Sequence, residues 1–489
     1  MSYEQILDTE TTKTEEEESK RLGGDPPLKT LGKLALGPVL SEIGSSTYGV
    51  VDGVWVGKML GKEGLSAAGS VFVLQYIVHG FSSFIQVSLN SKLGYLYGKK
   101  SSARIPCVLV DIFRISILLG LIVPALLLPL AHPVMNLIGI SEKNQTNGFL
   151  YLLPVCSGFL ITALFHFSCA ILQANGLSLH YGIAMLTTNV IDMCIFDPLF
   201  LVAFKTKIWG SSLATIISNL IVFIIVIVYL TKKKLFIIPE DYKWFGSFSH
   251  DTLSASKVGL SAFITQIAMT LPAVLIQKYL SLSSHEIGVS TEVMGVWHIM
   301  ARVYHVVEMI MTAMARAFIP AASFAYGSSK GKRFLLLAVH ILWIGVSWAA
   351  ICSFSFSVFP VQICRIWTDD STFMTWLEKM IPPSVYTAAL SPMRATVSAI
   401  LQSMKRGHSA SLLNFLAQFV AIPTFASILY FTKKDDPVRI VWCYVFSDST
   451  AFLLSLLFAI SPIKEIMSLF KNENNNTNNT SQPLNEEGK

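Results

Sequence analysis

The chain has 489 residues, of which 52% are hydrophobic and only 14% are charged, with a formal net charge of +6. Soluble domains carry about 25% charged residues, whereas the apolar residues here gather in blocks of roughly 20, the length that crosses a bilayer. The positive charge lies in loops and forms no basic arm of the kind that binds nucleic acid. Composition therefore argues against secreted, cytosolic and nucleic-acid-binding proteins and indicates a polytopic protein surrounded by the lipid bilayer.

Twelve apolar blocks predict twelve transmembrane helices, because a helix satisfies its backbone hydrogen bonds within lipid. In chain order, the first six blocks lie at about 34–56, 66–90, 105–131, 150–173, 181–204 and 210–230. The other six lie at about 257–280, 290–325, 334–358, 380–403, 409–431 and 438–460. The predicted fold is therefore an all-α polytopic membrane protein.

Loop charges predict how these helices are oriented. With the N-terminus inside, roughly 20 basic residues fall on the cytoplasmic side and roughly 11 on the other, as the positive-inside rule expects. Both termini are then cytoplasmic. Asn144 begins a glycosylation sequon in an outside loop, and the sequence leaves open whether it carries a glycan.

Two landmarks recur along the chain. Tyr97-Gly98 after the second span resembles Tyr326-Gly327 after the eighth, and Gln173 at the end of the fourth resembles Gln402 at the end of the tenth. The separations Gly98 to Gln173 and Gly327 to Gln402 are both 75 residues. The chain is thus predicted to hold two parallel six-helix pseudo-repeats, a known plan for transporters whose substrate site lies between the halves.

The repeat divides the chain into five predicted parts. A disordered acidic tail (1–30) precedes the first six-helix lobe (31–230), and a linker (231–256) leads to the second lobe (257–462). A disordered Asn-rich tail (463–489) follows. The tails are predicted to be disordered because they hold too little apolar surface to offset their chain entropy.

Charged residues inside spans are costly and are functional candidates by default. Asp52 lies roughly 27 Å into the first span and Asp197 roughly 24 Å into the fifth, at 1.5 Å per residue. Thr215, near the outer start of the sixth span, is expected at a similar depth, and Tyr48 is one turn below Asp52. These groups are predicted to bind a proton or small cation, with Asp192 as a weaker candidate. The alternative is that the two deeper aspartates are hydrated caps near the outer interface.

The second half is charged differently. One stripe of the eighth span holds several polar side chains, namely His298, Arg302, His305, Thr312 and Arg316. The stripe either lines the substrate pathway or forms an internal salt-bridge lock with Glu308 and Asp448. If the stripe lines the substrate pathway, Glu308 is a second cation-responsive carboxylate, and Arg302 adjusts its affinity for the cation. Glu42 either lines a cytoplasmic vestibule or pairs with a neighbour, and Asp111 with Arg114 is predicted to form a structural ion pair.

Several of these segments resemble the multidrug and toxic compound extrusion (MATE) family. The resemblance rests on Gly37-Pro38, Val51-Asp52, Gly57, Leu60-Gly61, Asp197-Pro198, Trp209-Gly210, Leu213-Ala214-Thr215, Pro320 and Tyr326-Gly327. It implies that Asp52 is the essential acid of the first span, with Tyr48, Asp197 and Thr215 completing a cation-responsive site.

The sequence departs from the pattern of that family in three places. Met193 stands where the family usually has asparagine, although Asn189 is one turn lower. Gln266 stands where one branch of the family carries glutamate, and the tenth span has no acid. These departures put a Na⁺ site in the second half in doubt.

Repeat and resemblance together predict a secondary active antiporter, coupled to H⁺ or Na⁺, that exports organic and often cationic drugs and metabolites by alternating access. The alternative is a flippase for lipid-linked oligosaccharide or a related amphiphile. No catalytic triad, metal constellation or phosphate loop is found, so neither an enzyme nor a cofactor beyond the coupling ion, nor a structural metal, is expected. The chain is expected to act as a monomer in the plasma membrane, an internal membrane being the alternative. The residues expected to line the substrate cavity are Gln75, Tyr76, Phe84, Gln266, Arg302 and Tyr304.

Overall fold

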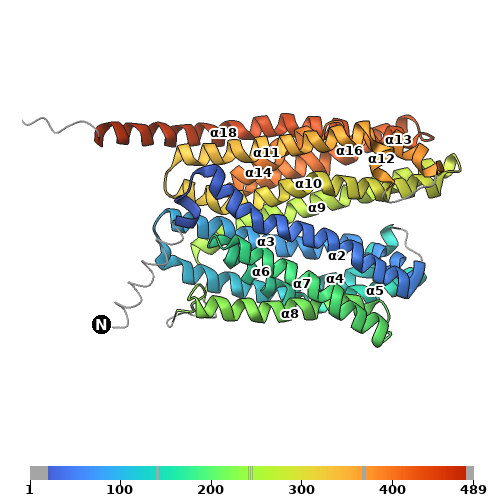
Figure 1. Cartoon of the computed structure of the whole chain (residues 1–489), viewed down its shortest axis with the longest axis horizontal. Coiled ribbons are helices and arrows are strands. Elements are labelled where there is room, and N and C mark those ends of the chain that lie inside the picture. The colour runs from blue at the N-terminus through green and yellow to red at the C-terminus, as the bar shows by residue number, and fades with distance from the viewer. Residues whose placement is uncertain are drawn as a thin grey trace, which may run out of the picture.

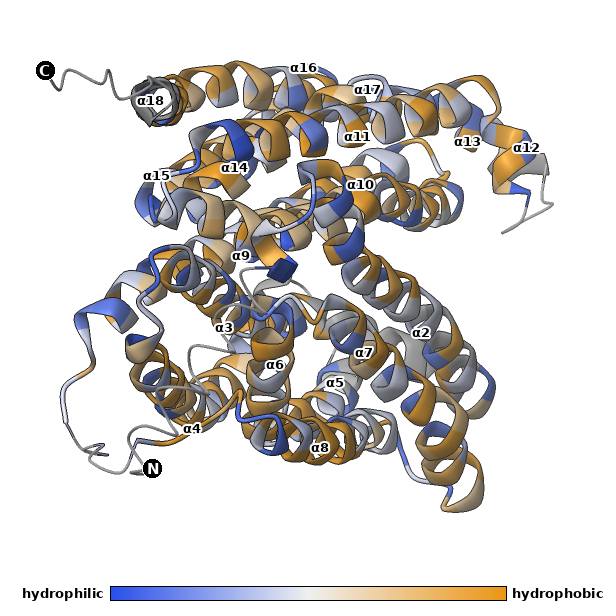
Figure 2. Cartoon of the chain, turned by 60° about the vertical axis from the view of Figure 1, so that its left-hand side comes forward, coloured by the Kyte–Doolittle hydropathy of each residue, from blue (hydrophilic) through white to orange (hydrophobic). Residues whose placement is uncertain are grey.

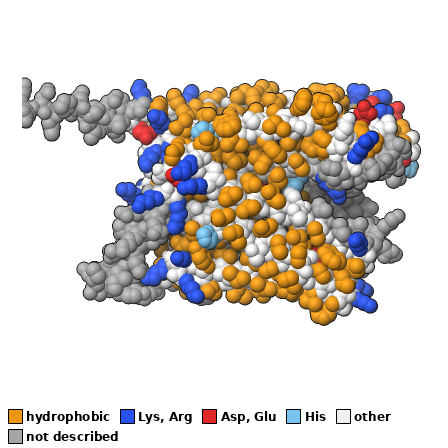
Figure 3. Space-filling view, in the orientation of Figure 1, with side chains coloured by type: hydrophobic (Ala, Val, Ile, Leu, Met, Phe, Trp, Pro, Cys, Tyr) orange, Lys and Arg blue, Asp and Glu red, His pale blue; other side chains and the backbone are white. Residues whose placement is uncertain are grey.

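The computed structural model describes residues 20–138, 142–239, 242, 244, 246–365 and 371–480. Residues 1–19 and 481–489 of the two predicted tails lie outside this set, as do the side chains of Asn144 and His298 and those at 60–70. Every regular element in the described residues is helical, and hydrophobic residues run along the helices (Figure 2). On the face seen in Figure 3, hydrophobic side chains occupy most of the middle of the bundle, and most of the coloured charged side chains lie toward its ends. This arrangement confirms the predicted all-α membrane fold.

The first six predicted spans are each found as a helix or a short series of helices. They are α2 (Pro27–Ser70), α3 (Phe72–Gly98), α4 (Ile105–Ile138), α5 (Glu142–Ser157) with α6 (Phe159–Ala174), α7 (Ser178–Ile191) with the π-helical η2 (Asp192–Phe196) and η3 (Pro198–Ala203), and α8 (Trp209–Lys232). A short 3₁₀ turn, η1 (Ser102–Arg104), precedes α4.

The second six follow the same order. They are α9 (His250–Glu286), α10 (Ser290–Gly327), α11 (Gly331–Val358), α13 (Ser371–Val385) with η4 (Ala388–Leu390) and α14 (Ser391–Ser403), α15 (Gly407–Asn414) with the π-helical η5 (Phe415–Val420) and α16 (Ala421–Thr432), and α18 (Cys443–Thr480). The short α12 (Pro360–Cys364) and α17 (Pro437–Val441) lie between spans. Among the described helices, eight are long and apolar enough to cross a membrane, or nine if α5 and α6, bent by 49°, count as one span.

The chain forms two lobes, the first from α2 to α8 and the second from α9 to α18 (Figure 1). Helices α3 and α10 lie between them, because α3 packs on α9 and α10 packs on both α2 and α3. The end of the bundle at which α2 and α9 begin, and α3 and α10 end, is called the inner end, because loop charge predicts it to face the cytoplasm. The lobes meet at this end, and their ribbons diverge toward the other (Figure 1).

The repeated glycines explain the close approach of the lobes at the inner end. A Cβ on Gly98 would lie 2.1 Å from the carbonyl oxygen of Phe324, and one on Gly327 would lie 2.3 Å from that of Tyr95. Gly94 likewise faces the carbonyl oxygen of Pro320, at 2.5 Å. The two landmark glycines therefore occupy equivalent places, each allowing the backbone of the opposite lobe to pass.

Substituting Gly98 with alanine is expected to lower the free energy of unfolding by about 1–3 kcal/mol, because an overpacked contact forces the backbone to shift. The matched control is Gly49→Ala, since a Cβ on Gly49 would meet no atom within 4 Å. Because Ala is a better helix former than Gly, that control should be neutral or slightly stabilising. Thermal unfolding of the two purified variants in detergent measures both effects. Equal melting temperatures would contradict the close contact at Gly98.

Parts of both predicted tails, residues 20–30 and 463–480, are among the described residues and are mostly helical. Leu22 is fully buried, and Arg333 donates hydrogen bonds to the carbonyl oxygens of Leu22 and Asp25 at 2.9 and 2.7 Å, so the prediction of disorder through residue 30 is wrong for this segment. Helix α18 continues past residue 463, where Ile466 is 1% exposed and Glu465 pairs with Arg406. The prediction was wrong there because these few side chains find partners that only the folded bundle provides.

The connection between the lobes is anchored on α4. The predicted pair is confirmed, with Arg114 Nη1 at 3.3 Å from Asp111 Oδ1. The carboxylate of Asp111 also accepts hydrogen bonds from the backbone N–H of Ser249 at 2.9 Å and from the hydroxyl of Thr252 at 2.8 Å. The guanidinium of Arg114 lies 4.7 Å from the ring centre of Phe248. The linker thus begins after Lys232, ends before His250 and is tied to the first lobe.

Candidate functional site

Two polar side chains of α2 meet α8 in the first lobe. The hydroxyl of Tyr48 lies 3.0 Å from the hydroxyl of Thr215, and Ser211 donates a 2.6 Å hydrogen bond to Asp52 Oδ1. Tyr48 and Asp52 are one helical turn apart, as are Ser211 and Thr215, so each pair shares one face of its helix. The structure therefore brings together the predicted Tyr48, Asp52 and Thr215. Ser211 was missed, although its spacing of four from Thr215 was a usable signal.

The fifth span contributes two more carboxylates to the same region. Asp192 is 2% exposed and Asp197 is fully buried, and both lie close enough to Asp52 for the charges to interact. Asp192 Oδ1 and both carboxylate oxygens of Asp197 have no hydrogen-bond partner among the described residues. An ionised carboxylate is very costly to bury without a partner. The site is therefore one in which a proton or cation would be stabilised.

The backbone around these aspartates departs from an α-helix. Pro198, directly after Asp197, lacks an N–H and its ring would clash with the carbonyl one turn earlier. The chain responds by adopting wider π-helical turns over Asp192–Phe196 and Pro198–Ala203, a form that occurs frequently at functional sites. The carbonyl oxygen of Met193, exposed by this local geometry, accepts a 3.1 Å hydrogen bond from Trp55 Nε1 on α2.

Asn189 lies one turn before Asp192, at the α2 contact. Its side-chain nitrogen is buried without a partner in the described part of the chain. A Cβ on Gly44 of α2 would lie 3.2 Å from this side-chain nitrogen. The absence of a side chain at Gly44 therefore lets α2 and α7 pack closely. The predicted group of Tyr48, Asp52, Asp192 and Thr215 is thus flanked by Asn189. Within the residues described, no three His, Cys, Asp or Glu side chains are placed to hold a metal ion together.

The polar stripe of the eighth span faces α2. His305 Nε2 lies 2.9 Å from the hydroxyl of Ser46, and Arg316 Nη1 lies 2.8 Å from Glu42 Oε1. At Arg316 the stripe therefore forms an ion pair between the two lobes, and its acidic partner is Glu42 of α2. Of the two alternatives for the stripe, the internal lock with Glu308 and Asp448 is not formed by Arg316, because α10 turns this arginine toward the other lobe.

Glu308 and Asp448 lie together in the second lobe. Their charges interact, and Asp448 Oδ2 accepts a 3.0 Å hydrogen bond from the hydroxyl of Thr387. Glu308 Oε1 is buried without a partner among the side chains described. The nearby cation is Arg394, which sequence reasoning missed, and it donates a 3.1 Å hydrogen bond to Asn414 Oδ1. Arg302, expected to tune Glu308, is exposed.

The residues expected to contact substrate lie on both sides of the lobe boundary. Phe84 on α3 packs against Gly259 on α9, and Gln266 on α9 approaches Gly80 on α3. The other four, spread over α3 and α10, are partly or largely exposed; they are Gln75, Tyr76, Arg302 and Tyr304. Their role in binding substrate stays a prediction.

A second ion pair closes the inner end. Lys92 Nζ on α3 lies 2.7 Å from Asp251 Oδ1 on α9, and the Lys92 side chain is only 3% exposed. Arg104 lies 3.6 Å from the other carboxylate oxygen of Asp251. Nearby, the hydroxyl of Ser91 donates a 2.9 Å hydrogen bond to the carbonyl oxygen of Gln402 in the opposite lobe. These contacts and the Glu42–Arg316 pair hold the lobes together in their inner halves.

Asp251→Asn is expected to destabilise the protein by about 3 kcal/mol, because removing one partner of a buried pair leaves the other charge uncompensated. Asp436→Asn is the control, since Asp436 pairs with Lys433 near the surface, where such pairs contribute about 0–1 kcal/mol. Melting temperatures of both variants in detergent measure the difference. A melting temperature of Asp251→Asn equal to that of the control would show that Lys92 does not depend on this carboxylate.

Comparison with known proteins identifies the fold. The sequence matches the MatE family over residues 39–196 and 263–425, one segment in each lobe. The chain belongs to the MatE family. The two matched segments contain Tyr48, Asp52 and Asp192 in the first lobe and Gln266 and Glu308 in the second. The resemblance inferred from the residues is thereby confirmed.

Relatives of this MatE protein are multidrug exporters by name. "Multidrug export protein MepA" of Staphylococcus aureus is 20% identical over 434 residues, 88% of this chain and 93% of that protein. "Probable multidrug resistance protein YoeA" of Bacillus subtilis is 27% identical over 205 residues, 40% of this chain and 43% of that protein. MatE membership and these relatives establish an integral, multi-pass membrane transporter.

Two solved structures share the fold of this MatE protein. One is a MOP superfamily transporter from Pyrococcus furiosus, with a TM-score of 0.82 at 18% identity, over 92% of this chain and 98% of the other. The second is the outward-facing conformation of a multidrug resistance MATE family transporter, with the same TM-score, identity and coverage. The likeness supports twelve transmembrane helices in two six-helix halves.

Proposed function

We propose that the protein is a secondary active antiporter of the plasma membrane that exports organic, often cationic, compounds in exchange for H⁺ or Na⁺. It acts as a monomer, and the coupling cation is taken up in the first lobe within the polar group that contains Asp52, Asp192 and Asp197, beside Tyr48 and Thr215. The substrate binds between the lobes.

The observation that carries this proposal is the buried cluster of carboxylates. Three aspartates from two spans lie close enough for their charges to interact, and three of their six carboxylate oxygens are buried without a partner in the described structure. A cation or proton taken up there would relieve both the repulsion among the aspartates and the cost of burying their charge. Hydrated caps at a membrane interface would instead be exposed to water, and Asp197 is fully buried.

The position of the cluster supports coupling to lobe movement. Asp52 and Glu42 are on the same helix, α2, ten residues apart, and Glu42 forms the ion pair with Arg316 of the second lobe. Uptake of a cation at Asp52 would change the contacts of α2 with α8, and the same helix carries half of the inner lock. An ion can drive the change only if it binds the two conformations with different affinity.

Transport by purified protein in proteoliposomes tests the proposal. A fluorescent organic cation is loaded inside, and an imposed pH gradient or Na⁺ gradient is compared with no gradient. We expect one of the two gradients to accelerate efflux of the dye and the other to have no effect, which identifies the coupling ion. Efflux that responds to neither gradient contradicts antiport, and scrambling of a labelled lipid in the same vesicles would support the flippase alternative.

A further inference from the structure

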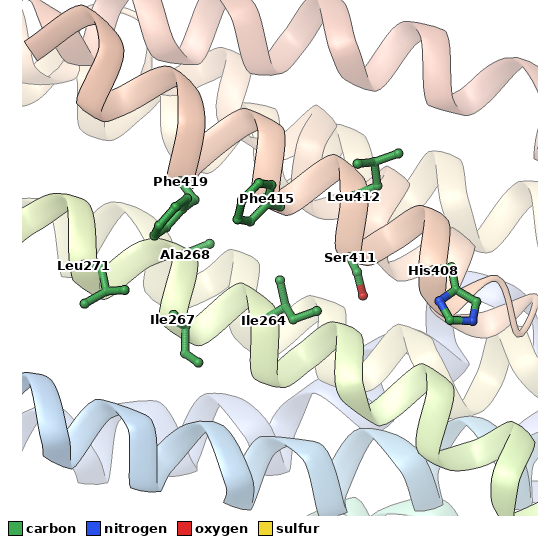
Figure 4. A pocket seen from close by; sticks show the side chains of 9 residues that line it. All are labelled: Ile264, Ile267, Ala268, Leu271, His408, Ser411, Leu412, Phe415 and Phe419. Atoms are coloured by element: carbon green, nitrogen blue, oxygen red, sulfur yellow. The ribbon is translucent and has the colours of Figure 1, made fainter. Parts of the chain in front are cut away.

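A groove of about 470 Å³ runs along the second lobe between α9 and α15–η5, apart from the carboxylate cluster. Figure 4 shows side chains of both helices pointing into it, with His408 at one end and Phe419 toward the other. Its walls are apolar over most of this length, including Ile264, Ala268 and Leu271 of α9. Leu412 and Phe415 are exposed, so the groove opens to the surface of the bundle.

The groove is built by one face of each helix. On α9 the spacing Lys257, Ile264, Leu271 repeats every seven residues, so the lysine lies on the same face as the apolar wall. On α15 and η5 the lining residues His408, Leu412, Phe415 are likewise three or four apart. The far wall is formed by Phe415 with Phe419, whose rings stack with centres 4.8 Å apart.

The inner end of the groove is polar and cationic. A Cβ on Gly407 would lie 2.2 Å from the carbonyl oxygen of Lys257, so the first turn of α15 touches α9 at the level of this lysine. Lys257 and His408 are both exposed there, and neither forms an ion pair with a described residue. The groove is apolar along its length and ends in an unpaired cation at the predicted cytoplasmic interface. It therefore complements an anionic lipid, whose acyl chain lies within the bilayer and whose charged headgroup lies at the interface.

We propose that this groove binds an anionic phospholipid of the inner leaflet. One acyl chain lies between α9 and η5, the phosphate faces Lys257, and His408 donates a hydrogen bond to the headgroup. Phe263, the residue before Ile264 and about a quarter of a turn away around α9, has its ring 4.5 Å from that of Phe81 in the first lobe. The lipid would therefore pack on the same helix, α9, that contacts the first lobe through Phe263.

Native mass spectrometry of the whole purified protein tests this site. The protein is equilibrated with an equimolar mixture of phosphatidylglycerol and phosphatidylcholine. We expect the wild type to retain phosphatidylglycerol preferentially, and the Lys257→Ala, His408→Ala double variant to lose this preference about fivefold, since one basic residue near a membrane surface contributes about that factor. Two variants fill the groove from opposite walls, Ser411→Phe and Ile264→Trp, and each should retain one lipid fewer.

The control removes a histidine and a lysine from the first lobe, neither of which lines this groove. His180 lies near the start of α7, as His408 does in α15, but its ring stacks on Tyr229 with centres 5.4 Å apart. The double variant His180→Ala, Lys232→Ala should retain lipid like the wild type. The proposal is overturned if both filled variants retain lipid as the wild type does, or if the control loses it equally. Displacement of the lipid by the transported dye would also overturn it, because the groove would then be a path for substrate.

Discussion

Replacing Asp52 with asparagine is expected to abolish ion-driven efflux while leaving the protein folded. Asparagine has nearly the same shape and its side-chain oxygen can still accept the hydrogen bond from Ser211, but it cannot gain and lose a positive ion. The difference in ion affinity between the two conformations then disappears, and with it the coupling. The rate of gradient-driven dye efflux from proteoliposomes should fall at least about tenfold, which corresponds to about 1.4 kcal/mol.

Two further variants separate this effect from damage to the fold. Ser211→Ala removes the hydrogen-bond donor but keeps the carboxylate, so it should retain most of the gradient response. Asp436→Asn changes an aspartate that caps α17 through the backbone N–H of Arg439 and is remote from the cluster, and it should transport normally. Gradient-driven efflux by Asp52→Asn at the wild-type rate would remove Asp52 from the coupling mechanism.

Reversing the charge at either end of the Glu42–Arg316 pair is expected to open the inner end of the protein. In Glu42→Arg or Arg316→Glu, like charges would replace an attraction between atoms 2.8 Å apart. Breaking a buried pair costs about 3–5 kcal/mol, and because this pair is partly exposed we expect a smaller shift, roughly tenfold in favour of the open form. Exchanging both charges should restore the closed form.

The reporter is a single cysteine at Ser91, in a variant whose seven native cysteines are replaced. Ser91 is 1% exposed and lies at the closed inner contact. The rate of maleimide labelling should rise about tenfold in each single reversal and return to the starting value in the double reversal. Lys33→Glu, which breaks an exposed pair with Asp25, serves as the control and should leave labelling unchanged. Unaltered labelling in both single reversals would show that the pair does not hold the lobes together.

The fold could be read from the sequence because its signals are local. A block of apolar residues predicts a helix wherever it occurs in the chain, and the equal separations of Gly98–Gln173 and Gly327–Gln402 required only counting. The depth of Asp52 and Thr215 followed from the rise per residue and the direction of each span. The structure places these two residues near one another, as that argument expects.

What the sequence by itself determined was therefore the helices, their duplication and the polar residues that lie within the membrane. Only the tertiary structure decided which of these residues are partners. The partner of Arg316 is Glu42 in the other lobe, and that of Asp448 is Thr387. Such pairings depend on the rotation of each helix about its axis and on the close approach that Gly98 and Gly327 allow. The order of residues 20–30 and 463–480 could not be predicted for the same reason. Leu22 and Ile466 are buried by helices far away in the chain, and the local sequence pattern does not indicate these contacts.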